Sequence, residues 1–208
     1  MPHLALLGDA SLANGRYTAP EPDTATQVQQ QLPDWTVTLL AAGGATMAEI
    51  PAQLQRFPAG VDLAVLSVGG NDALEHVGLL QQPSKSSSDT LDALHRMVQE
   101  FSEKYDKVVP VLSRLAGRVL LCTIYEAPLV GENTASRARV VLTLLNDYIL
   151  RTAARGGMDV LDLRSICSSK DDFVMQIEPS AKGAAKIAQA VARAATGQGG
   201  RRLSVIIG

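Results

Sequence analysis

Short apolar runs recur along the chain, and glycine or polar residues follow each of them. The first run, Leu4–Leu7, leads directly into Gly8-Asp9. Such a run indicates a buried strand that breaks into a tight turn. The carboxyl ends of parallel strands share one edge of a sheet, where ligand crevices form. The pattern predicts five strands, over His3–Leu7, Trp35–Ala42, Asp62–Val68, Arg118–Tyr125 and Val160–Leu163.

Helical patterns separate the predicted strands. Asp23 is a suitable N-cap, and Thr46 with Glu49 three residues later has the pattern of a capping box. We expect the longest helix to break before Pro110, because proline inside a helix removes a backbone hydrogen bond. Pro179 fits the first turn of the last helix. The predicted helices cover residues 24–32, 46–54, 89 or 90 to 114, 134–154 and 179–195.

Five strands that alternate with helices predict an α/β protein whose parallel sheet is covered on both faces. The chain has 208 residues, of which 46% are hydrophobic, enough for one domain with a sizeable core. We expect that domain over residues 1–196 and a tail over 197–208. The end of the tail, Ser204–Gly208, is apolar and could add an edge strand, pack on the surface or fray.

Composition argues against several classes of partner. The net charge of −2 gives no electrostatic footprint for nucleic acid, and no apolar run is long enough to predict a membrane span. The start Met1-Pro2-His3 has no signal-peptide pattern, and Cys122 and Cys167 are expected to be reduced structural thiols, so we expect a cytoplasmic protein. Neither a phosphate-binding glycine loop nor zinc-ligand spacing occurs, so the sequence predicts no cofactor and no metal.

Residues that could take part in catalysis or binding lie at the predicted strand ends. Asn71 offers an amide donor, and Gly44 offers a backbone N–H that no side chain obstructs. Together with the N–H of Ala10 these donors would form an oxyanion hole. In the alternative interpretation each glycine serves only a tight turn and Asn71 caps a helix. Turn chemistry explains each position singly, but it explains their joint placement poorly.

These motifs resemble the SGNH/GDSL hydrolases. That family carries Gly-Asp-Ser after the first strand, Gly after the second, Gly-x-Asn-Asp after the third and Asp-x-x-His near the C-terminus. This chain has Gly8-Asp9-Ala10, Gly44, Gly69-Gly70-Asn71-Asp72 and Glu178-Pro179-Ser180. The last motif resembles a lysophospholipase-like subgroup with Glu-Pro-Ser in place of His-Pro-Ser. The resemblance implies a three-layer α/β/α sandwich with a flavodoxin-like five-stranded parallel sheet, and ester hydrolysis through a serine acyl-enzyme.

The position of the family's nucleophile holds Ala10, which has no oxygen to attack a carbonyl. We favour an engineered replacement of serine by alanine, because the remaining oxyanion machinery would otherwise be idle. A naturally inactive homologue is the second explanation. The third is that Ser11 is the nucleophile, although a shift by one position along an extended segment turns the side chain the other way.

The expected histidine base is also missing. Glu178 stands at the family's histidine position and Met175 at its aspartate position. A carboxylate can accept a serine proton, and an apolar pocket would raise its basicity. His76 follows the Asn71-Asp72 motif closely and is the other candidate for the general base.

Five further residues are expected to line the substrate pocket: Asp9, Ser11, Asn14, Gly70 and Tyr125. Asp9 would also bind turn amides around position 10. Asn14 could equally belong to an ordinary surface loop. Asp162 and Arg164 are expected to form a structural ion pair.

The resemblance and these residues lead to one principal reading and two alternatives. The principal reading is a GDSL-type serine esterase or acylhydrolase whose partner is a small-molecule ester and whose nucleophile is replaced by Ala10. The first alternative is an inactive binding module for an acylated or carbohydrate ligand. The second, a flavodoxin-like nucleotide or flavin binder, is disfavoured because no phosphate cradle occurs.

Overall fold

The computed structural model describes residues 1–76, 83–131 and 133–198. Its central sheet has five strands in the order β2-β1-β3-β4-β5, and all neighbouring strands are parallel. This arrangement confirms the predicted parallel α/β sheet. The strands are β1 (His3–Gly8), β2 (Thr36–Leu39), β3 (Val61–Ser67), β4 (Ala116–Cys122) and β5 (Asp159–Leu161).

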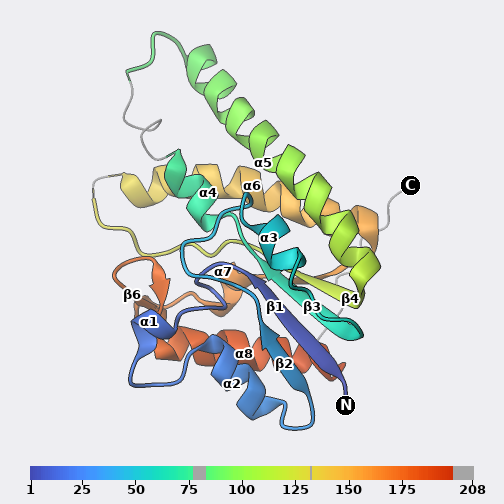
Figure 1. Cartoon of the computed structure of the whole chain (residues 1–208). Coiled ribbons are helices and arrows are strands. Elements are labelled where there is room, and N and C mark those ends of the chain that lie inside the picture. The colour runs from blue at the N-terminus through green and yellow to red at the C-terminus, as the bar shows by residue number, and fades with distance from the viewer. Residues whose placement is uncertain (77–82, 132, 199–208) are drawn as a thin grey trace.

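Helices cover both faces of the sheet, which gives three layers (Figure 1). On one face lie α5 (Ser87–Leu115) and α6 (Thr134–Gly156); on the other lie α2 (Thr24–Gln31) and α8 (Ala181–Ala195). Side chains alternate along β1 because successive residues of a strand point to opposite faces. Ala5 and Leu7 join the α5/α6 core, whereas Leu4 and Leu6 join the α2/α8 core.

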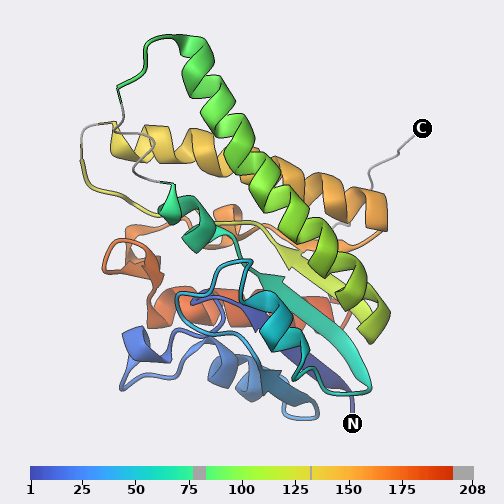
Figure 2. The ribbon, with the colours of Figure 1, turned by 45° about the horizontal axis from the view of Figure 1, so that its top comes forward.

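Shorter elements occupy the connections around the sheet. The single-turn helices are α1 (Gly15–Thr18), α3 (Ile50–Leu54), α4 (Gly70–Glu75), α7 (Leu163–Ile166) and the 3₁₀ helix η2 (Lys170–Asp172). Strands β6 (Phe173–Val174) and β7 (Glu178–Pro179) pair as an antiparallel hairpin apart from the main sheet. Figures 1 and 2 both show α4 at the carboxyl end of β3, next to α6.

The predicted break before Pro110 is wrong, because α5 runs through this residue to Leu115. Pro110 lies on the exposed side of the helix. The carbonyl of Asp106, which loses its partner there, lies on an exposed residue and can bind water. The helix also begins earlier than expected, since Ser86 and Asp89 form a capping box.

Two other predicted helix starts also need correction. Thr46 and Glu49 do bond to each other, but α3 begins only at Ile50, with Pro51 in its first turn. Proline favours that place because it lacks the N–H that a first turn leaves free. Pro179 lies in β7, and Ser180 is the N-cap of α8. The apolar end of the tail, Ser204–Gly208, lies outside the described residues. In the described part of the chain no helix is long and apolar enough to cross a membrane.

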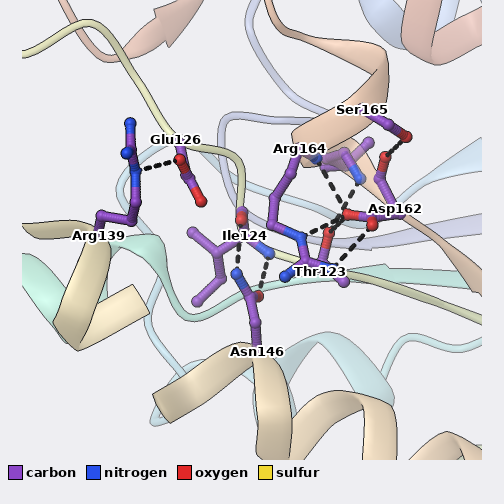
Figure 3. A network of polar contacts seen from close by, with 9 residues as sticks. Thr123, Ile124, Glu126, Arg139, Asn146, Asp162, Arg164 and Ser165 are labelled. Carbon is purple, nitrogen blue, oxygen red and sulfur yellow. Dashed lines mark hydrogen bonds and ion pairs between the residues drawn. The ribbon is translucent and has the colours of Figure 1, made fainter. Parts of the chain in front are cut away.

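Two buried carboxamides hold the backbone where strands end. Gln53 of α3 accepts a hydrogen bond from the Gly8 N–H at 2.8 Å and donates to the Gly8 carbonyl at 2.9 Å. Asn146 of α6 accepts from the Ile124 N–H at 2.7 Å and donates to the Ile124 carbonyl at 2.9 Å (Figure 3). A side-chain amide suits this task because it carries a donor and an acceptor side by side.

We predict that Asn146→Leu lowers the free energy of unfolding by about 3 kcal/mol, because it leaves a buried N–H and a buried carbonyl of Ile124 without partners. Urea unfolding monitored by circular dichroism measures the loss. Thr143→Ala, at an exposed position of the same helix, is the control and should change the free energy by less than about 0.5 kcal/mol. Equal stability of Asn146→Leu and the parent would contradict the assigned role.

Candidate active site

The turn after β1 is held tightly against β3. Gly8 has a φ of +122°, and a Cβ there would overlap the carbonyl oxygen of Ser67. The same carbonyl accepts a hydrogen bond from the Asp9 N–H at 2.9 Å. Only glycine fits this position. The packing of Gly8 therefore determines where Ala10, two residues later, enters the site.

A pocket of about 230 Å³ opens at the carboxyl end of the sheet, with Ala10 in its wall. Residues from four segments line it: the turn after β1, helix α4, the loop that follows β4, and the β6–β7 hairpin. Helix α6 forms the remaining wall. The sequence-predicted residues on this wall are Asp9, Ala10, Gly70, Asn71, His76, Tyr125 and Glu178.

Asn71 lies at the start of α4 and lines the pocket together with Ala10. Its Nδ2 donates to the Ala45 carbonyl at 3.0 Å. A carboxamide nitrogen carries two hydrogens, so one remains for a ligand. Gly44 neighbours Ala45 but lies exposed, with a φ of +83°, and is not part of the pocket wall. The pocket therefore unites two members of the expected oxyanion hole, Ala10 and Asn71, and leaves Gly44 beside it.

Asp9 is 6% exposed, and its carboxylate accepts the Ser11 N–H at 2.9 Å. The pKa of Asp9 is raised to about 6, chiefly by burial and to a smaller extent by the carboxylates of Glu178 and Asp72, although hydrogen bonds from Ser11 lower it. Asp9 thus holds the turn amide, as expected, and also faces the pocket. It brings a buried negative charge next to Ala10.

The two candidate bases lie on different walls of the pocket. Glu178 is the first residue of β7, and burial raises the pKa of its carboxyl group, while a hydrogen bond from Tyr17 lowers it. His76 caps the end of α4, and its Nε2 lies 3.8 Å from a carboxylate oxygen of Glu100. The charge of Glu178 contributes to the raised pKa of Asp9, the residue that precedes Ala10 in the pocket wall.

The hairpin that carries Glu178 is fastened to the loop after β4. The Tyr125 hydroxyl donates to the Ile177 carbonyl at 2.8 Å, and the Tyr125 and Phe173 rings lie 5.1 Å apart between centroids. The Val130 N–H donates to the Gln176 side chain at 3.2 Å. Tyr125 thus holds Ile177, the residue before Glu178, in addition to lining the pocket.

The two remaining expected pocket residues, Ser11 and Asn14, lie behind the wall. Both are buried, and neither is part of the pocket lining. Asn14 donates to the Pro179 carbonyl at 2.9 Å and accepts from the N–H and hydroxyl of Thr24. Its amide therefore ties the turn after β1 to β7, the strand of Glu178.

Two aspartates outside the pocket wall have structural partners. Asp72 accepts the Met47 N–H at 3.0 and 3.2 Å, and so joins α4 to the loop after β2. Asp162 and Arg164 form the expected ion pair at 2.7 Å, and Asp162 also accepts from Thr123 (Figure 3). Among the described residues, no group of three or more His, Cys, Asp or Glu side chains could hold a metal ion.

Sequence reasoning did not find the wall formed by α6. Ala135, Ala138, Arg139 and Leu142 recur at helical spacing on one face of this helix and line the pocket. That spacing predicts a helix face that meets other parts of the protein. It does not distinguish a face that packs on the core from a face that borders a cavity.

The chain belongs to the GDSL-like lipase/acylhydrolase family, whose model matches residues 6–186. This match covers every element from β1 into α8, and so includes all of the pocket walls. No curated protein matches the chain.

Solved structures share the fold at low sequence identity. An extracellular lipase from Streptomyces rimosus is 15% identical with a TM-score of 0.66, and the alignment covers 89% of this chain and 96% of that one. LAE5, an α/β hydrolase from the Lake Arreo metagenome, has 18% identity, a TM-score of 0.69 and coverages of 94% and 95%. Axe2, an acetylxylan esterase from Geobacillus stearothermophilus, has 16% identity, a TM-score of 0.67 and coverages of 92% and 93%. The fold is therefore that of the SGNH hydrolases.

The raised pKa of Asp9 leads to a prediction about stability. Its pKa is about 6 in the folded protein and about 3.9 in an unfolded chain. Because the folded state holds the proton more tightly, this group lowers the free energy of unfolding as the pH rises from about 4 to about 6, by up to about 3 kcal/mol. Asp9→Asn should remove this loss, so that stability at pH 7 relative to pH 4 improves by that amount.

Urea unfolding of the parent and of Asp9→Asn at both pH values measures the difference. Asp34→Asn, at an exposed site, is the matched control and should leave the pH dependence unchanged. The same pH dependence in the parent and in Asp9→Asn would show that Asp9 is not the group responsible.

Proposed function

We propose that this pocket binds a carboxylic ester with its carbonyl above Ala10, and that position 10 is the nucleophile position of a GDSL-type serine esterase. The observation that carries the proposal is that Ala10 and Asn71, distant in sequence, line one pocket with Glu178. A methyl group at position 10 cannot attack a carbonyl, so the chain as it stands binds the ester and forms no acyl-enzyme.

The residues of the pocket would act as follows with a serine hydroxyl at position 10. That hydroxyl would attack the ester carbonyl, and the free Asn71 amide hydrogen and the N–H of residue 10 would stabilise the developing oxyanion. Glu178 would take the hydroxyl proton and return it to the leaving alcohol. Water would then release the acid from the enzyme by the same proton route.

Glu178 is the better candidate for the proton acceptor. It reaches the pocket from the hairpin that Tyr125 and Asn14 fasten to the neighbouring segments. Its charge also acts on Asp9, the residue next to position 10. His76 lies at the far end of α4, beside Glu100. A serine-to-alanine replacement in a functional esterase would leave these surroundings intact around an inert methyl group, as they are here.

We predict that Ala10→Ser creates hydrolysis of short p-nitrophenyl esters, which release of p-nitrophenol measures. Ala13→Ser adds a hydroxyl in the same turn but outside the pocket wall, and should stay inactive. Activity already present in the parent and lost in Ser11→Ala would instead identify Ser11 as the nucleophile. An inert Ala10→Ser on a broad panel of esters would favour the binding module.

The same assay tests the oxyanion hole. Introduced into the Ala10→Ser protein, Asn71→Ala should lower kcat by about 10²- to 10³-fold, because a donor aimed at the transition-state oxygen is lost. An unchanged kcat would show that Asn71 does not stabilise the oxyanion.

The proton acceptor determines the pH profile of the Ala10→Ser protein. Burial raises the pKa of Glu178, and only its ionised form can accept a proton. Activity should therefore fall as the pH drops through that raised pKa. Glu178→Gln should lower kcat by at least about 10²-fold and remove this limb of the profile.

His76→Gln is the matched comparison, with the same side-chain amide placed on a different wall of the pocket. It should keep the acidic limb and most of the activity. The reverse result, with His76→Gln inactive and Glu178→Gln active, would assign the base to His76.

A further inference from the structure

Most of the pocket wall is apolar. Apolar side chains from three segments form this part: Leu74 of α4, Leu129 of the loop after β4, and Leu142 of α6. Leu74 is 42% exposed, and the other two are half-buried. When an apolar group covers apolar surface that is exposed to water, the free energy of the system falls.

The charged groups on this part of the wall neutralise each other. Arg139 Nε lies 2.7 Å from a carboxylate oxygen of Glu126 (Figure 3). The pair joins α6 to the loop after β4, which Asn146 also ties to α6. Two sets of contacts therefore connect α6 to the loop after β4. The opposite charges of Arg139 and Glu126 also leave no net charge at this ion pair to attract a polar group.

The size of the pocket sets a limit on what fills it. A cavity of about 150 Å³ accommodates benzene, which has six carbons. The volume of about 230 Å³ found here thus corresponds to roughly nine carbons by the same scale. The α6 wall from Ala135 to Leu142 extends about 10 Å along the helix axis. An acetyl group alone would leave most of this space empty.

We propose that the α6 side of the pocket binds the linear aliphatic acyl chain of the ester, of medium length, and that Ala138 is a specificity-determining residue. The inference rests on the proposed ester binding at Ala10. The acyl carbonyl lies between Ala10 and Asn71, and the chain extends between α4 and α6. Ala138 is half-buried and lies in the middle of the α6 wall, where a larger side chain would fill the space of the acyl chain.

Binding to the chain as it stands tests the inference without any turnover, because the protein has no nucleophile at position 10. The probes are two neutral esters, methyl acetate and methyl hexanoate, measured by isothermal titration calorimetry. Neutral probes are needed because the carboxylates of Asp9 and Glu178 would oppose a free acid. Each added methylene that is buried should tighten binding by about fourfold, so methyl hexanoate should bind at least about tenfold more tightly.

Ala138→Leu should remove that advantage, so that methyl hexanoate binds no more tightly than methyl acetate. Ala154→Leu is the matched control, since it makes the same substitution at a half-buried position of α6 away from the pocket, and it should keep the preference for methyl hexanoate. Ala135→Leu, one turn earlier on the same wall, repeats the test if Ala138→Leu proves unstable in thermal unfolding.

Equal affinity for the two esters, or no binding of either, would overturn the inference. So would an unchanged preference in both Ala138→Leu and Ala135→Leu. Equal affinity or an unchanged preference leaves the proposed hydrolysis standing, whereas no binding of either ester would also contradict the proposed ester binding. An inert Ala10→Ser protein that still prefers methyl hexanoate would contradict the hydrolysis alone. In an active Ala10→Ser protein, kcat/KM should favour p-nitrophenyl hexanoate over the acetate, and Ala138→Leu should reverse that order.

Discussion

Paired hydrogen bonds from buried carboxamides to strand-end backbone hold this site together. Gln53 bonds both backbone groups of Gly8, and Asn146 bonds both backbone groups of Ile124. Each pair satisfies an N–H and a carbonyl where the chain leaves the sheet and would otherwise bury them unpaired. Because Gly8 precedes Ala10 and Ile124 begins the loop wall of the pocket, the two pairs fix two of the segments that line one cavity.

The sequence predicted the sheet well because its strands are short apolar runs with clear endings. It also indicated the edge of the sheet at which Ala10, Asn71 and Glu178 line one pocket. It failed at Pro110, because exposure of the helix face there is a property of the tertiary structure. It gave no indication that Asn14 turns inward to hold Thr24 and Pro179, since a polar residue in a loop has the same sequence appearance whether it faces a ligand or the protein.

The α6 wall is a second feature that depends on the tertiary structure and not on the local sequence pattern. Helical spacing identifies a face, but the neighbour of that face depends on how far α4 and the loop after β4 approach it. Here the small side chains of Ala135 and Ala138 leave space in the pocket beside α6. The Glu126–Arg139 ion pair connects α6 to the loop after β4. The shape of the cavity is therefore set by contacts between segments that are far apart in the sequence.

The two carboxyl groups of the pocket would affect product release in a protein with serine at position 10. Asp9 and Glu178 both have raised pKa values because burial opposes their negative charge. An ester enters such a pocket as a neutral molecule, whereas the acid that hydrolysis leaves ionises near neutral pH. The newly formed anion would then face like charges at close range, which favours departure of the product and disfavours its rebinding.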